Sequence, residues 1–184
     1  MRKAKICLAG AAATALVGFL AAPAAAAPTD TTDTTFEVLA GTLDIVAPAT
    51  ADLGTGAPGG TITGQLGTVT VTDSRASDDA SWVASVTATV FQTGTSSPPE
   101  TVLPEEIDYW SGPATATTGT GTFTPGQLTA GDAAPLSSVT PLTAFTHGGG
   151  TGGNTASWDP TLVVNVPLDS IAGVYTGTVT HSVA

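Results

Sequence analysis

Aromatic side chains are the residues of this sequence best suited to binding a ligand, because an indole or phenol ring can stack on the apolar face of a sugar. Five residues are candidates for such stacking: Trp82, Tyr109, Trp110, Trp158 and Tyr175. Large aromatic residues also fill protein cores. Trp82 falls on the apolar face of an alternating run, which favours the core. Tyr109 and Trp110 precede a Gly-Pro turn signal and are expected in an exposed loop. Trp158 precedes Asp159-Pro160, and both readings stay open for it.

Arg75 is the only Lys or Arg after residue 26, and it lies among Asp73, Asp78 and Asp79. Its planar guanidinium group could recognise a ligand or tie its loop to a nearby carboxylate. The second interpretation is favoured, so we expect a structural ion pair between Arg75 and Asp73. The three carboxylates offer hard oxygen ligands to Ca²⁺, but their spacing does not match an EF-hand loop. A solvated acidic turn is favoured over a calcium site.

Other titratable residues give no pattern of catalysis. Glu105 and Glu106 are adjacent and would point apart in an extended chain, which argues against a glycosidase pair. His147 and His181 have no cysteine partner and no zinc-ligand spacing. The glycine-rich segment 148–153 lacks the Gly-Lys-Ser/Thr ending of a phosphate loop. We therefore expect no catalytic residues, no metal ion and no cofactor.

Residues 1–26 have the parts of a secretory signal: a basic start, an apolar run over residues 6–20, and small residues before a cleavage point after Ala26. The run is too short to span a bilayer. Cleavage removes the only Cys and leaves one basic residue against 15 acidic ones, a formal net charge of −14. This acidity argues against nucleic-acid binding. The sequence predicts a secreted protein without a disulfide or a remaining membrane span.

After residue 36 the sequence alternates apolar residues with threonine and serine, which is the period of a β-strand. Threonine is β-branched and suits a half-exposed position on a sheet. We expect strands at four alternating segments: 68–72, 81–91, 161–166 and 174–183. Residues 104–109 are expected to form at most a single turn. The pattern predicts an all-β, antiparallel Ig-like sandwich over residues 36–184, after a signal helix (1–26) and a polar leader (27–35).

Two blocks of sequence resemble the WxL domain of Gram-positive surface proteins, especially its actinobacterial relatives. The first is residues 66–75 (LGTVTVTDSR) with Trp82-Val83-Ala84, and the second is residues 156–167 (ASWDPTLVVNVP) with 172–184. The resemblance covers most of residues 36–184. It implies an exported all-β domain that associates noncovalently with cell-wall peptidoglycan. The family's two Trp-x-Leu motifs would fall at 82–84 and 181–183, which adds His181 to the ligand-binding candidates.

These observations lead to two expected functions. The first is a noncatalytic, secreted protein, extracellular or associated with the cell wall, that binds wall glycan noncovalently. The alternative is a structural or interaction subunit that packs against another surface protein, for example by adding a strand to an exposed sheet edge. The chain keeps only two His and loses its Cys with the signal, so an enzyme is the least favoured reading.

Overall fold

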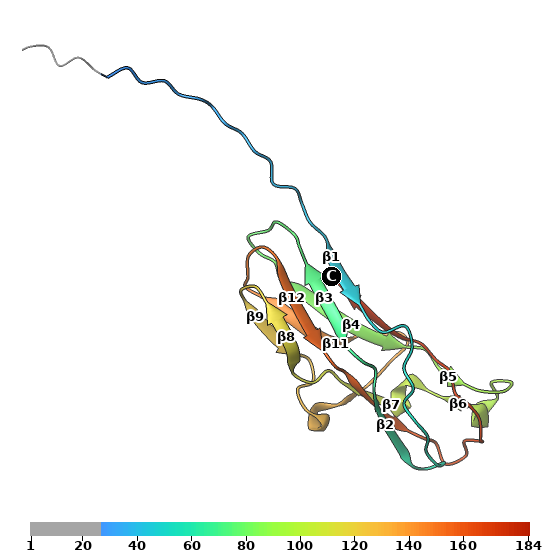
Figure 1. The fold of residues 1–184 in the computed structure, drawn as a ribbon. Coiled ribbons are helices and arrows are strands. Elements are labelled where there is room, and N and C mark those ends of the chain that lie inside the picture. Colours follow the sequence, from blue (N-terminus) through green and yellow to red (C-terminus); the bar gives the residue numbers. More distant parts are fainter. Residues whose placement is uncertain (1–26) are drawn as a thin grey trace, which may run out of the picture. The chain divides into compact units, whose positions relative to one another are not determined.

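The computed structural model describes residues 27–184, and the signal helix predicted over residues 1–26 lies outside the described residues. The chain divides into two units after Phe36. The described part of the first unit, residues 27–36, contains no regular secondary structure. The second unit, Glu37–Ala184, contains every strand and the whole buried core of the described chain (Figure 1).

The second unit is built from short strands and three short 3-10 helices. The strands are β1 (Leu43–Val46), β2 (Thr61–Gln65), β3 (Val69–Asp73), β4 (Trp82–Ala88), β5 (Phe91–Gln92), β6 (Thr101–Val102), β7 (Ile107–Trp110), β8 (Ala114–Thr118), β9 (Thr122–Pro125), β10 (Ala134–Pro135), β11 (Leu142–Gly148), β12 (Asn154–Trp158), β13 (Thr161–Asn165) and β14 (Val179–Val183). The 3-10 helices are η1 (Pro98–Glu100), η2 (Pro104–Glu106) and η3 (Ala130–Asp132). The all-β prediction with antiparallel sheets is confirmed.

All strand pairs between named strands are antiparallel. Three sheets have four strands each, in the orders β1-β3-β12-β8, β10-β7-β13-β2 and β14-β4-β11-β9, and β5 pairs with β6. Three short connections link the first two sheets, because β2 leads into β3, β7 into β8, and β12 into β13. Two of these connections are hydrogen-bonded to each other, because the N–H of Leu66, between β2 and β3, donates to the carbonyl oxygen of Pro160, between β12 and β13, at 2.9 Å. Pairing therefore continues from one sheet into the next.

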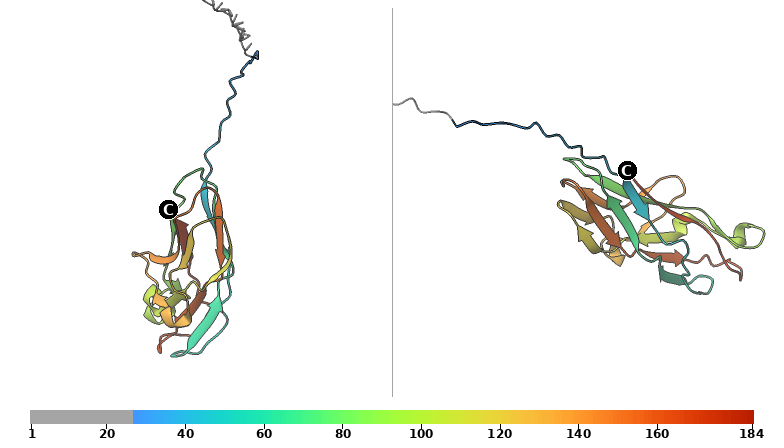
Figure 2. Two further views of the ribbon diagram at one scale, coloured as in Figure 1. Left: turned by 90° about the vertical axis from the view of Figure 1, so that its left-hand side faces the viewer. Right: turned by 45° about the horizontal axis from the view of Figure 1, so that its top comes forward.

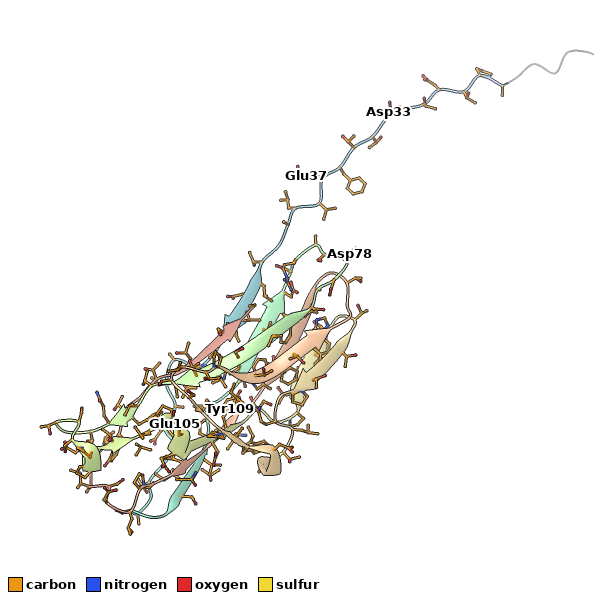
Figure 3. All side chains as sticks on the ribbon, turned by 180° about the vertical axis from the view of Figure 1, so that it is seen from behind. Asp33, Glu37, Asp78, Glu105 and Tyr109 are labelled. Carbon is orange, nitrogen blue, oxygen red and sulfur yellow. The ribbon has the colours of Figure 1, made fainter. Side chains whose placement is uncertain are left out.

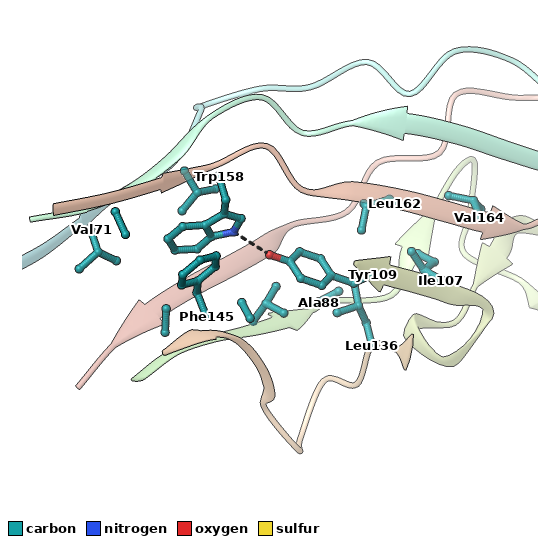
Figure 4. Close-up of a cluster of buried hydrophobic side chains, with 14 of the residues drawn as sticks. Val71, Ala88, Ile107, Tyr109, Leu136, Phe145, Trp158, Leu162 and Val164 are labelled. Carbon is teal, nitrogen blue, oxygen red and sulfur yellow. Dashed lines mark hydrogen bonds between the residues drawn. The ribbon is translucent and has the colours of Figure 1, made fainter. Parts of the chain in front are cut away.

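The first and third sheets pack face to face, as the views in Figure 2 show. The Phe145 ring of β11 stacks on the Trp158 indole of β12, with ring centroids 4.9 Å apart and planes 22° apart. The buried core continues beneath β7 and β13 through Ile107, Tyr109 and Leu162 (Figure 4). Buried apolar surface, without any disulfide among residues 27–184, must supply most of the stability of this unit.

Alternation of side chains explains why these segments are strands. In β4 the buried residues occur at every second position, beginning with Trp82 and ending with Ala88. The strand expected over 81–91 stops at Ala88, whose N–H donates to the Ser137 carbonyl oxygen, and the chain pairs again only as β5. The strand expected over 174–183 is continuous only from Val179, with one isolated bridge before it.

Candidate functional site

Three of the predicted ligand-binding residues meet in a chain of hydrogen bonds inside the core. The Trp158 indole N–H donates to the Tyr109 hydroxyl oxygen at 3.2 Å (Figure 4), and this oxygen lies 3.2 Å from His181 Nε2. The hydroxyl has one proton, so it donates to His181 only when Nε2 is unprotonated. The arrangement fits a neutral His181 that carries its proton on Nδ1.

Burial favours the neutral form of both titratable groups in this chain of bonds. Desolvation lowers the pKa of His181 to about 4. It also raises the pKa of the Tyr109 hydroxyl well above its ordinary value. His181 Nδ1 is buried and has no hydrogen-bond partner within residues 27–184. Neutral, enclosed groups of this kind connect β7, β12 and β14 and suit a structural role.

A second network involves Trp82 and the only basic residue after residue 26. The Trp82 indole N–H donates to Asn154 Oδ1 at 2.8 Å. Arg75 donates to both carboxylate oxygens of Asp73, at 2.9 Å from Nε and 2.8 Å from Nη2, and to the Ser81 carbonyl oxygen at 2.8 Å. The expected ion pair is therefore present. Its hydrogen bonds lower the pKa of Asp73.

The six residues predicted to stack on or bind a ligand do not form an exposed aromatic surface. Trp82, Tyr109 and Trp158 are at most 2% exposed, and Trp110, Tyr175 and His181 are partly buried. The expectation that Tyr109 lies in an exposed loop is wrong, because residues 107–110 form β7, hydrogen-bonded between β10 and β13. Stacking of Trp82, Tyr109 or Trp158 on a glycan would require the core to open.

The acidic residues and histidine considered as metal or catalytic candidates lie at exposed positions or are already hydrogen-bonded within the protein. Asp78 is exposed in the loop between β3 and β4, and Glu105 lies in η2 (Figure 3). Asp79 accepts a hydrogen bond from the Ser81 backbone N–H at 3.1 Å. The ring nitrogens of His147 each lie 2.9 Å from a backbone carbonyl oxygen. Among residues 27–184, no three His, Cys, Asp or Glu side chains are grouped to hold a metal ion.

A cleft of about 920 Å³ lies beside His181. One wall is the segment 47–56, which joins β1 to β2, and another is the segment 170–179, which leads into β14. Its apolar lining includes residues in or next to β2, β5, β6 and β13: Ile62, Leu66, Phe91, Val102, Leu162 and Val164. His181 also lines the cleft, so the cleft borders the Tyr109 hydrogen-bond chain.

Sequence reasoning did not identify this cleft or Ser170 on its wall. The Ser170 side chain belongs to a residue only 8% exposed, and its hydroxyl has no hydrogen-bond partner in the described chain. One sequence signal was present: residues 171–184 contain no Asp, Glu, Lys, Arg or Pro. A strand of that composition lacks the residues that usually block pairing at a sheet edge.

No protein-family model, curated protein or solved structure matches this chain. Within residues 27–184, none of the helices is long and apolar enough to cross a membrane.

Proposed function

We propose that this chain is an exported, noncatalytic Ig-like β-sandwich of the cell surface that binds wall peptidoglycan noncovalently. The observation that supports it most is the placement of the two blocks that resemble the WxL domain. They contribute β3, β4, β12, β13 and β14, and they pair with each other as β3 with β12 and β4 with β14. Segments far apart in the sequence thus form one structural unit, as a shared domain would require.

The charge of the chain limits how it binds a cell wall. A protein with a net charge of −14 after signal cleavage is repelled by anionic wall polymers. The one basic residue of the described chain is occupied by Asp73 and the Ser81 carbonyl. Attraction must then come from hydrogen bonds and apolar contacts. Exposed threonines of β8 and β9 and the lining of the cleft offer such groups.

This mode of binding predicts salt tolerance. We expect the chain starting at Ala27 to sediment with purified peptidoglycan at least as well at high NaCl as at low NaCl, because added salt screens repulsion and weakens no essential ion pair. A basic wall-binding protein serves as the control, because high NaCl should release it from the peptidoglycan. Absence of the chain from the pellet under both conditions contradicts the proposed wall binding.

A second candidate function is that of an interaction subunit in a surface assembly. The observation that favours it is the apolar cleft beside β14, which pairs with one neighbour only in the described sheets. Open strand edges next to apolar pockets are the surfaces that added strands recognise. Isolation of the chain from its source together with a defined surface protein, stable to washing, supports this function. Recovery of the chain alone contradicts it.

A further inference from the structure

We propose that a segment before β1 of one copy adds as a strand to the cleft of a second copy, so that the protein self-associates head to tail. The donor segment is residues 35–40 (TFEVLA), and the host edge is residues 174–183. This inference deepens the second candidate function and rests on it, since it names the partner as another copy of the chain.

The host edge has open backbone groups along the cleft. Thr176 exchanges two hydrogen bonds with Gln92, at 3.0 and 3.1 Å, and Thr89 donates to the Thr178 carbonyl oxygen at 2.9 Å. Alternate residues of an antiparallel ladder direct their N–H and C=O groups to opposite sides. Gly177, Val179 and His181 therefore present theirs away from β4 and β5. All three also line the cleft.

The composition of the host edge leaves it open to pairing. Exposed edges usually carry charged residues or proline, which discourage the addition of another strand. Three other edge strands carry such a residue, since β1 includes Asp44, β9 includes Pro125 and β10 includes Pro135, whereas β2 and β8 carry neither. The host edge has neither a charged residue nor a proline, and its first residue, Val174, is 84% exposed. This edge therefore carries no residue that discourages pairing and lies beside an apolar cleft, and β1 lies close to its β14 end without hydrogen-bonded pairing.

The donor segment has the properties of a strand without a partner. Phe36, Val38 and Leu39 are 90%, 69% and 76% exposed. Residues 37–40 make no hydrogen bond to the rest of the second unit. In an extended segment Phe36 and Val38 point to the same side, so both can enter the cleft while Glu37 stays outside. Main-chain pairing would supply affinity, and the two apolar side chains would supply specificity.

The size and charge of the contact define the kind of assembly. A six-residue guest buries much less than the roughly 1,200–2,000 Å² of a stable interface, so a single contact belongs to the weak class. Glu37 of the donor and Asp52 of the cleft wall have the same charge, so salt should strengthen the contact. Donor and host are different surfaces, so the contact is heterologous and continues into chains or closes into rings.

Sedimentation velocity on residues 27–184, which include the whole core, tests the inference. We expect the sedimentation coefficient to rise from micromolar to millimolar protein, and to rise further with NaCl. The double variant Phe36→Asp, Val38→Asp should stay monomeric. Val139→Asp is the matched control, because Val139 is 84% exposed in the loop before β11, and it should associate as the wild type does.

Complementation of two defective copies makes the test specific. Ala172→Trp fills the cleft mouth at an exposed lining residue and leaves the donor segment intact. This variant and the double variant should each be monomeric alone, with wild-type circular dichroism, and should form a 1:1 complex when mixed. A wild type that stays monomeric at millimolar concentration and high salt overturns the inference, as does equal association of the double variant. Because this test uses no cell wall, its failure is separate from a failure of peptidoglycan binding or of binding to a different protein.

Discussion

His181 is a position where a single proton changes the balance between the folded and unfolded chain. Its Nε2 faces the Tyr109 hydroxyl, and burial lowers its pKa to about 4 from an ordinary value of 6.5. Between these two values the unfolded chain binds a proton at this residue and the folded chain does not. Stability therefore falls as the pH falls through this window, and His181 adds no pH dependence above it.

The predicted effect is a loss of unfolding free energy that approaches about 1.4 kcal/mol per pH unit between pH 6.5 and 4. Urea unfolding of the wild type and of His181→Gln, at several pH values in this range, measures it. The glutamine variant lacks the titrating group, so its stability should vary less with pH. Proton NMR provides a check: a His181 ring that titrates near 6.5 in the folded protein contradicts the prediction.

At the level of single residues, the sequence predicted some contacts and missed others. Arg75 and Asp73 were found because an isolated cation pairs with a carboxylate two residues away. The prediction for Tyr109 was wrong because β7 has only four residues, which are too few to show a period of two. The burial of Tyr109 depends on β10 and β13, which come later in the chain. The Tyr109–His181 contact spans 72 residues and has no local signal.

Tight turns between strands determine how the elements close on the core. The turn from β8 to β9 includes Gly121, which has a φ of +108°. A Cβ atom at this position would meet the His147 ring and the carbonyl oxygens of Gly148 and Gly149. Only glycine allows the turn to pack against the end of β11 in this way.

Gly121→Ala is therefore expected to destabilise the protein by about 2–4 kcal/mol, combining an unfavourable backbone conformation with overpacking. The matched control is Gly149→Ala, at a φ of +67° with open space around the added atom, which should cost about 1 kcal/mol. Chemical denaturation of both variants measures the difference. Equal stability of the two variants would show that the contact with His147 does not constrain the turn.

Alternation in the sequence was sufficient to predict the strands with one buried face, such as β3, β4 and β13. It was not sufficient to predict where a strand leaves one sheet for another. The division of 154–165 into β12 and β13 follows from Asp159-Pro160, whereas the pairing of each half depends on β3 and β2. Sheet order is set by contacts between distant segments, which a pattern with a period of two does not encode.

At the scale of the whole molecule, acidity is the main property that the fold must tolerate. Residues 27–184 carry all 15 acidic residues of the chain and one arginine. Self-repulsion of like charges destabilises a compact state. The net charge can be counted from the sequence alone, whereas the exposure of most carboxylates is known only from the structure.

Screening of this repulsion should raise the melting temperature at pH 7. If high NaCl raises the free energy of unfolding by about 1 kcal/mol, the midpoint of thermal unfolding rises by roughly 2–4 °C for a chain of this size. Thermal unfolding from low to high NaCl measures the effect. The same series at pH 3, where most carboxylates are protonated, is the control and should show a smaller rise. A midpoint that falls with salt at pH 7 is incompatible with self-repulsion.

The ion pair of Arg75 also limits how readily a protease cleaves the folded chain. Trypsin cleaves after lysine or arginine, and residues 27–184 offer it one such bond, between Arg75 and Ala76. The guanidinium group that the enzyme must engage is already bonded to Asp73 and to the Ser81 carbonyl. Digestion would thus proceed only after the loop between β3 and β4 opens, and a single cut would report that local opening.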